Sequence, residues 1–116
     1  PEIKAEQYTL EFANRDTWNT GLDDDARKGF QVLKLFKEHG FEGEIGIGVS
    51  DVHVNEIESP ELIRDRILYA AKALGDPTKI YVNPDCGLRT RTREVSFDKI
   101  RSMVKGAELA RKNLTK

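Results

Sequence analysis

The chain has few of the residues that would indicate a cross-linked or membrane-embedded fold. Its 116 residues include one cysteine, one methionine and four prolines. A single cysteine cannot form an internal disulfide, which fits a reducing cytoplasm. The longest apolar runs span only a few residues, far short of a transmembrane helix. We therefore expect a cytoplasmic domain of ordinary length.

An excess of charge of either sign is also missing. The 19 Lys and Arg residues stand against 20 Asp and Glu residues, which gives a formal net charge of −1. Such a balance gives no indication of nucleic acid or a membrane surface as a partner, and we expect neither. The chain begins at Pro1 with neither an initiator methionine nor a signal-peptide pattern. We expect residues 1–116 to be a single unit and a fragment of a longer domain.

Three short segments have the β-branched and aromatic composition of buried strands, and each is followed by a helical pattern. The expected strands are Tyr8–Phe12, Ile45–Val52 and Lys79–Asn83. The expected helices run from a cap at Asp23 or Asp24 to Gly40, from a cap at Ser59 and Pro60 to Gly75, and roughly from Val95 to Lys112.

Apolar residues recur at helical spacing within each expected helix, so one face of each is expected to be buried. These residues are Ala26, Phe30, Leu33 and Phe36 in the first helix, Leu62, Ile63, Ile67, Ala70, Ala71 and Leu74 in the second, and Phe97, Ile100, Val104, Ala107 and Leu114 in the third.

Alternating strands and helices predict an α/β fold with parallel strands joined by right-handed crossovers. Three such units form either a small open sheet or a slice of a (β/α)₈ barrel. A complete barrel needs about 250 residues, and three eighths of that is roughly 95, close to the length of this chain. The length favours the barrel slice.

Residues capable of chemistry stand where each predicted strand ends: Glu11, then Asp51 and His53, then Asp85 and Cys86. The carboxyl ends of parallel strands form one face, where active sites gather. Alone, the cysteine fits a buried small apolar residue and the histidine a structural role. An ionised Glu11 at the end of a buried strand is costly unless it is paired or binds a metal. The combination favours a metal or thiol site.

Two further patterns have plainer interpretations. The run Gly46-Ile47-Gly48 lies within a strand and not at a strand–helix turn, so we expect close approach of backbone or ligand there, not a phosphate loop. The basic residues Arg89, Arg91, Arg93 and Lys99 are expected to be solvated surface charge, with anion binding as the alternative.

The run from Asn83 to Arg91, Asn-Pro-Asp-Cys-Gly-Leu-Arg-Thr-Arg, closely resembles the C-terminal signature of cobalamin-independent methionine synthases and their shorter archaeal-type relatives. The run Gly48–His53 resembles the preceding strand of that family, and Tyr8–Glu11 resembles the strand before that. All three occur in the family's order, so the resemblance covers nearly the whole chain.

The resemblance implies the last three βα units of a TIM-barrel methyltransferase domain, with a zinc ion at the barrel mouth. Glu11 and Cys86 match two zinc ligands of the family, whose other two ligands lie on earlier strands that this chain does not contain. His53 matches the histidine that gives a proton to the departing folate nitrogen. Asp51 and Asp85, together with Asn83, are expected to position these groups or the substrate.

The substrates implied are homocysteine and a methyl donor, either 5-methyltetrahydrofolate or a methyl-corrinoid. Val54 and Asn55 replace the Ser-Pro usual after the family's histidine, and the segment after Glu11 is longer than expected, so the donor stays open. Alternatives are another zinc-dependent thiol alkylation, for example of coenzyme M, and a non-catalytic truncated chain. The remaining barrel strands, from the same or a companion chain, are an expected partner.

Overall fold

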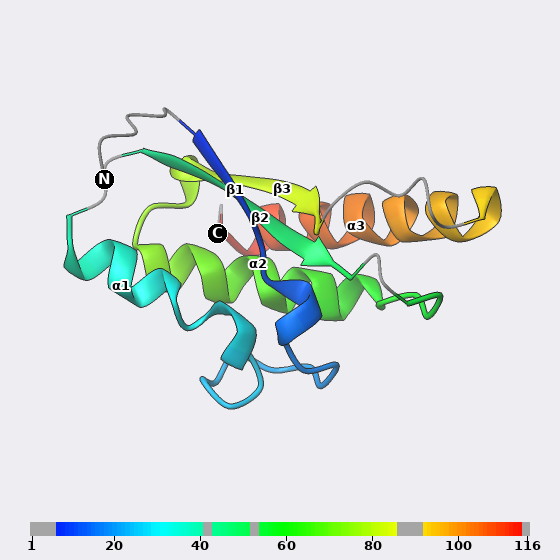
Figure 1. The fold of residues 1–116 in the computed structure, drawn as a ribbon, viewed down its shortest axis with the longest axis horizontal. Coiled ribbons are helices and arrows are strands. Elements are labelled where there is room, and N and C mark those ends of the chain that lie inside the picture. Colours follow the sequence, from blue (N-terminus) through cyan, green and yellow to red (C-terminus); the bar gives the residue numbers. More distant parts are fainter. Residues whose placement is uncertain (1–6, 41–42, 52–53, 86–91, 115–116) are drawn as a thin grey trace.

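The computed structural model describes residues 7–40, 43–51, 54–85 and 92–114. Three strands, β1 (Gln7–Glu11), β2 (Glu44–Ser50) and β3 (Ile80–Pro84), form one parallel sheet in the order β1-β2-β3. The helices α1 (Leu33–Glu38), α2 (Pro60–Leu74) and α3 (Arg93–Leu114) accompany the strands in alternation (Figure 1). None of the described helices is long and apolar enough to cross a membrane. Parallel strands in sequential order are the arrangement of consecutive βα units in a (β/α)₈ barrel.

The core lies between the sheet and the helices. Ile45, Ile47 and Val49 alternate along β2, are completely buried, and belong to one apolar cluster with residues of all three helices. Because side chains alternate across a strand, Gly46 and Gly48 face the opposite side of the sheet. The sheet therefore has one face packed on helices and one face formed at its centre by glycines.

The second helix agrees with its prediction at both ends. The Ser59 side chain accepts a hydrogen bond from the backbone N–H of Leu62 at 3.1 Å, and Pro60 follows at the first helical position. Gly75 ends the helix in the left-handed region at φ 92°, and its N–H donates to the carbonyl of Ala71. All six apolar residues predicted for the inner face of this helix are buried.

The first helix is much shorter than predicted. Asp23 caps only a single turn, and the regular α-helix begins at Leu33 after a 3₁₀ turn, Lys28–Phe30. Gly29 packs closely against Asp16: its N–H donates to Oδ1 of Asp16 at 3.1 Å, and a Cβ at Gly29 would lie 2.7 Å from the Asp16 backbone. These contacts with the loop after β1 replace the regular helical contacts that the local pattern predicted.

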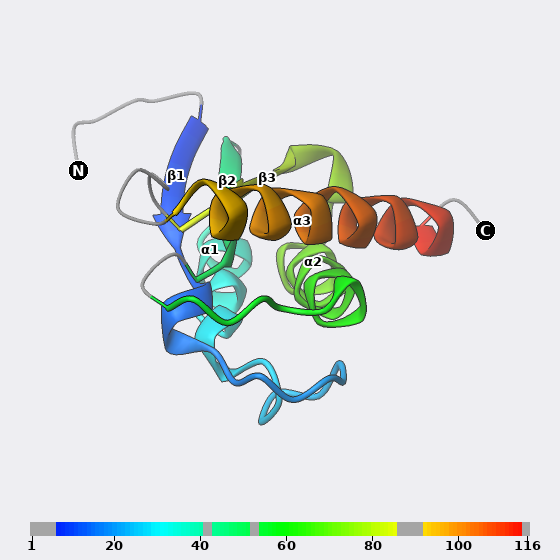
Figure 2. The same cartoon turned by 90° about the vertical axis from the view of Figure 1, so that its right-hand side faces the viewer.

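The third helix crosses α2 (Figure 2). It packs through a face other than the predicted one. Its buried residues are Lys99, Gly106 and Ala110. Gly106 permits close contact with α2, because a Cβ there would lie 2.4 Å from Cγ2 of Ile63. Helical periodicity identifies an apolar stripe but not the neighbour that covers it. Of the predicted residues only Ala107 packs against the core, while Phe97, Ile100, Val104 and Leu114 are exposed.

The strand predictions hold to within about two residues. β1 ends at Glu11 instead of Phe12, because the chain turns there into the 3₁₀ segment η1 (Ala13–Arg15). β3 begins and ends one residue later than expected. β2 ends at Ser50, and Val52, the predicted end, lies outside the described residues.

Candidate active site

The predicted chemistry-bearing residues that the structure describes lie at the carboxyl edge of the sheet. Glu11 is the last residue of β1, and Asp51 and Asp85 directly follow β2 and β3. Glu11 pairs in register with Gly48, and Gly48 pairs with Asn83. Partners in register point to the same side of a sheet. A carboxylate and an amide therefore flank a position without a side chain, on the face opposite the core.

Asp85 joins all three strand ends. Its backbone N–H donates to the carbonyl of Ser50 at 2.9 Å, which extends the pairing of β3 with β2. Its Oδ1 accepts from the backbone N–H groups of Phe12 at 3.2 Å and Ala13 at 3.0 Å, and its Oδ2 accepts from that of Asn14 at 2.7 Å. Asp85, which directly precedes Cys86 in the sequence, thus binds the backbone of the three residues that directly follow Glu11.

The environment of Asp85 works against its ionisation. Its exposed fraction is 3%, and burial raises the pKa of its carboxyl to about 6. The three backbone N–H donors oppose this rise in pKa, and the charge of Asp51 adds to it. The carboxyl group thus combines strong backbone hydrogen bonds with costly desolvation, a combination typical of functional sites.

Glu11 is exposed, which differs from the expectation of a buried carboxylate. It lies on the sheet face opposite the core, and its side chain is in contact with solvent. The side-chain Nδ2 of Asn14 donates to Oε1 of Glu11 at 3.1 Å. Asn83, which pairs with Gly48 from the neighbouring strand β3, is half-buried.

Two of the predicted site residues, His53 and Cys86, lie outside the described residues. Asp51, two positions before His53, and Asp85, directly before Cys86, are both described and buried. Within the described ranges, no group of three or more His, Cys, Asp or Glu side chains is placed to hold a metal ion. The described residues therefore supply at most part of a metal site.

A second set of polar contacts surrounds Glu58 and fixes the end of β2. The Glu58 side chain is 1% exposed. Its Oε1 accepts from the hydroxyl of Ser50 at 3.2 Å and lies 3.4 Å from Nζ of Lys99. Its Oε2 accepts from the backbone N–H of Asp51 at 2.7 Å and from Nη1 of Arg66 at 3.0 Å. One carboxylate thus connects β2, α2 and α3.

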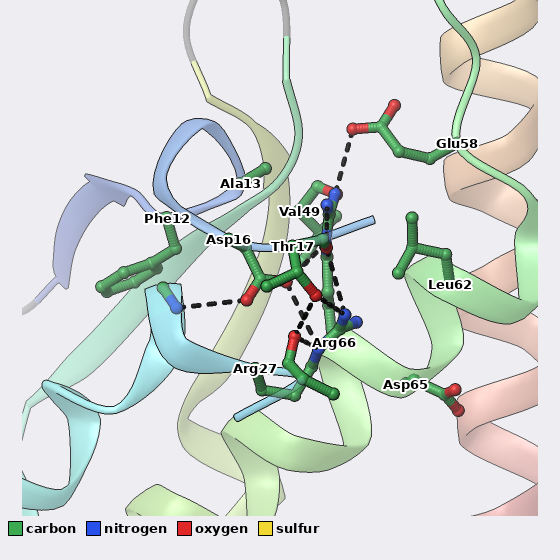
Figure 3. A network of polar contacts seen from close by, with 12 residues as sticks. Phe12, Ala13, Asp16, Thr17, Arg27, Val49, Glu58, Leu62, Asp65 and Arg66 are labelled. Carbon is green, nitrogen blue, oxygen red and sulfur yellow. Dashed lines mark hydrogen bonds and ion pairs between the residues drawn. The ribbon is translucent and has the colours of Figure 1, made fainter. Parts of the chain in front are cut away.

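Arg66 extends these contacts to the loop after β1 (Figure 3). This completely buried guanidinium donates through Nη1 to the carbonyl of Val49 at 2.8 Å. Its Nε donates to Oδ2 of Asp16 at 2.9 Å, and its Nη2 donates to the carbonyl of Thr17 at 3.1 Å. The ring of Trp18 lies 5.9 Å from the guanidinium carbon, within range of a cation–π contact. Arg66 therefore holds the ends of two neighbouring strands in one arrangement.

Arg27 provides the second cation for Asp16. Its Nε lies 3.3 Å from Oδ2 of Asp16, and its Nη2 donates to the carbonyls of Thr17 and Asn19. Nη1 of Arg27 is buried and has no hydrogen-bond partner among the described residues. Burial lowers the pKa of this arginine, and the nearby Asp16 charge opposes that effect. The loop after β1 is thus held by charged groups in the interior.

The sequence prediction missed this set of buried charges, which we call the ionic cluster; it consists of Asp16, Arg27, Glu58, Arg66 and Lys99. Lys99 had been expected on the surface but is 1% exposed, because Glu58 and the carbonyl of Glu56 surround its ammonium group. One signal was present in the sequence. Arg66 lies three residues after Ile63 and four before Ala70, on the apolar stripe of α2.

Taken together, the fold is a series of consecutive βα units of a (β/α)₈ barrel, with acidic residues gathered at the carboxyl ends of the strands. The sequence profile of the family described as "Cobalamin-independent synthase, Catalytic domain" matches residues 22–109. The chain belongs to this family, as its sequence motifs predicted.

Curated relatives extend the match to the whole chain. It is 50% identical over 120 residues to methionine synthase of Thermoplasma acidophilum and 43% identical over 120 residues to that of Thermoplasma volcanium. Each of these alignments covers 100% of this chain and 34% of the relative. The chain thus spans about a third of the length of the curated relatives it matches.

A solved structure supports the fold. The B12-independent methionine synthase of Shewanella sp. W3-18-1, in complex with selenomethionine, matches with a TM-score of 0.71 at 24% identity. The match covers 95% of this chain and 28% of that one. The predicted fold class, parallel strands with crossover helices from a TIM barrel, is therefore confirmed.

Proposed function

We propose that this chain supplies part of the zinc site and the proton donor of a methyltransferase that forms methionine from homocysteine. The proposal rests on membership of the cobalamin-independent synthase family and on relatives named methionine synthase. In this proposal residues 1–116 are the C-terminal part of a TIM-barrel catalytic domain. The remaining strands come from the same or a companion chain and contribute the other zinc ligands.

The observation that carries the proposal is the bond between Asp85 and the backbone after Glu11. Oδ1 of Asp85 accepts a hydrogen bond from the backbone N–H of Phe12. In the sequence, Glu11 directly precedes Phe12, and Cys86 directly follows Asp85. A carboxylate and a thiol are both common zinc donors. The donor set therefore fits zinc, and two ligands leave room for the further two that a tetrahedral site needs.

The proposed reaction breaks the bond between the methyl carbon and the donor and forms a bond from that carbon to the homocysteine sulfur. Zinc, when bound, would lower the pKa of the homocysteine thiol so that sulfur is present as thiolate. With 5-methyltetrahydrofolate as donor, the leaving nitrogen needs a proton, which His53 would give. With a methyl-corrinoid donor no nitrogen leaves, and this role of His53 is not required.

The other predicted residues have positioning roles in this proposal. Asp51 precedes His53, and its backbone N–H is held by Glu58. Asp85 holds the turn after Glu11. Asn83 offers an amide in register with Glu11 across the sheet. Gly48 lies between them on β2 and, having no side chain, leaves space for a substrate group.

The test uses what we call the completed barrel. This is the complete polypeptide that carries the chain, or a chimera in which residues 1–116 replace the matched third of the Thermoplasma acidophilum relative. Glu11→Gln and Cys86→Ser should each abolish tight zinc binding, measured by chelator competition. Glu44→Gln, an exchange of the same type at the other end of the sheet, is the control and should retain zinc. Stoichiometric zinc in both site variants would refute the ligand assignment.

A second experiment addresses the substrate. Completed barrel loaded with zinc is assayed with homocysteine or coenzyme M as acceptor and with 5-methyltetrahydrofolate or a methyl-corrinoid as donor. Methionine formation supports the proposal, and alkylation of coenzyme M alone contradicts it. His53→Gln should lower turnover with 5-methyltetrahydrofolate while zinc stays bound. Unchanged turnover with that donor would exclude His53 as the proton source.

A further inference from the structure

We propose that Asn14 is a positioning residue that sets the orientation of the Glu11 carboxylate for metal binding. This inference rests on the proposed function, because it takes Glu11 as a zinc ligand. Asn14 is not part of the sequence motifs from which the site was predicted. The structure assigns the role through contacts of its backbone and its side chain.

Asn14 is held from one side and reaches Glu11 from the other. Its backbone N–H donates to Oδ2 of Asp85 at 2.7 Å, the shortest of the three backbone bonds that this carboxylate accepts. Its side-chain Nδ2 donates to Oε1 of Glu11 at 3.1 Å. A buried anchor, Asp85, is thus connected through one residue to an exposed carboxylate.

The local backbone explains why residue 14 reaches residue 11. Ala13–Arg15 form the 3₁₀ turn η1 directly after β1. The turn begins two residues after Glu11, the last residue of β1, and it brings the Asn14 amide within hydrogen-bonding distance of Glu11. Asp85 accepts the N–H groups of both Ala13 and Asn14 and thereby fixes this turn.

The hydrogen bond has a direct consequence for a metal ligand. A carboxylate has two oxygens with about four lone-pair directions in total. A donor on Oε1 restricts the rotation of the Glu11 carboxylate and thereby sets the directions in which its lone pairs point. Partners of metal ligands that act in this way commonly change metal affinity by roughly 10- to 100-fold when they are removed.

The positioning role can be separated from a role in folding. Asn14 is exposed, so truncation of its side chain removes no buried contact. The bond to Asp85 comes from the backbone of Asn14 and persists in any variant with an N–H at this position. Side-chain variants at position 14 therefore change the contact to Glu11 and leave the anchor in place.

The experiment measures the zinc Kd of the completed barrel by chelator competition for Asn14→Ala, Asn14→Leu and Asn14→Gln. Leucine has a similar size but no donor, whereas glutamine keeps the amide. We expect zinc affinity to fall roughly 10- to 100-fold in the alanine and leucine variants and to recover in part with glutamine. Asn113→Ala is the matched control, because Asn113 is an exposed asparagine on α3 whose amide donates to the Leu109 carbonyl. This control should keep the parent Kd.

The outcomes separate this inference from the proposed function. If Glu11→Gln loses zinc while Asn14→Ala and Asn14→Leu keep the parent Kd, the role of Asn14 is overturned and the zinc site stands. If Glu11→Gln keeps zinc, the proposed function fails, and this inference fails with it. The melting temperature of the zinc-free protein should not change in the Asn14 variants. A fall in that temperature as large as the one in an Asp85→Ala variant would overturn the positioning role in favour of a structural one.

Discussion

Nε of Arg66 lies 2.9 Å from Oδ2 of Asp16, and neither side chain is exposed. The two residues are fifty positions apart in the chain, one on α2 and the other in the loop after β1. Burial of such a pair costs desolvation energy that its attraction offsets only in part, so the pair is weak evidence for stability. Its clearer effect is geometric, because it fixes the Glu11 end of β1 relative to the end of β2.

The first prediction concerns the loss of one member of this pair. Arg66→Met in the completed barrel should lower the free energy of unfolding by about 3–5 kcal/mol, because Asp16 and Glu58 would each lose a buried cation. Arg101→Met on α3 is the control and should cost at most about 1 kcal/mol, since Arg101 pairs with Asp98 and both side chains are exposed. Urea unfolding measures both. Equal losses in the two variants would contradict the importance of the buried pair.

The second prediction concerns the contact between α2 and α3. Gly106→Ala places a methyl group 2.4 Å from Cγ2 of Ile63 and 2.9 Å from the carbonyl oxygen of Pro60. We expect a loss of about 1–3 kcal/mol from overpacking, in spite of the better helix propensity of alanine. Glu108→Ala, at an exposed position two residues later, should change stability by no more than about 0.5 kcal/mol.

Thermal or urea unfolding measures this difference, and the double variant Gly106→Ala with Ile63→Ala tests its cause. If the methyl group clashes with Ile63, the double variant should be more stable than the sum of the two single losses predicts, because neighbouring changes are not additive. Strict additivity would show that the close approach does not limit the size of residue 106.

The third prediction concerns ionisation of Tyr69. Burial raises the pKa of Tyr69 above its usual value of 10.0, and a hydrogen bond of 2.7 Å from its hydroxyl to Asp24 adds to the rise. The folded state therefore favours the neutral phenol. This contribution to stability is present below pH 10 and is lost as the pH rises through the higher pKa of the folded protein.

Ultraviolet titration can follow phenolate formation as the difference between the protein and its Tyr69→Phe variant. Asp24→Asn should move the Tyr69 pKa back toward the usual value without reaching it, because burial remains. Tyr69 ionisation at the usual value in the parent protein would show that the hydroxyl is neither buried nor bonded as the structure describes.

The fourth prediction concerns the 116-residue chain by itself. β1 and β3 each pair on one side only among the described residues, and Phe97, Ile100 and Val104 are exposed on α3. Unpaired strand edges and exposed apolar helix faces favour association. The isolated chain should therefore self-associate in light-scattering measurements. Because it contains only two proposed zinc ligands, it should also bind zinc far more weakly than the completed barrel. A cooperative monomer that binds zinc tightly would contradict both expectations.

Much of the architecture follows from local patterns in the sequence. Ser59 with Pro60 and the left-handed Gly75 fixed both ends of α2, because caps and stops depend on short-range backbone chemistry. The β-branched composition of Ile45–Val52 indicated a short buried strand, and β2 forms there. The motif around Asp85 indicated the family that the comparisons confirm.

Other features depended on contacts between segments far apart in the chain. The late start of the first predicted helix accompanies the close approach of Gly29 to Asp16, and periodicity carries no information about such an approach. The sequence also gave no means to match Lys99 with Glu58, forty-one positions away. The pairing of opposite charges in the interior depends on the fold, because the fold determines which carboxylate lies next to each cation.

By itself, the sequence determined the order of strands and helices, the family, and which residues follow each strand. These are local properties, set by periodicity, caps and a contiguous motif. Only the tertiary structure showed that Asp85 binds the turn after Glu11, that Asn14 reaches back to that carboxylate, and that the ionic cluster links two strand ends. The physical reason is that hydrogen bonds and ion pairs depend on distance in space, and residues far apart in sequence become neighbours only when the sheet and helices pack.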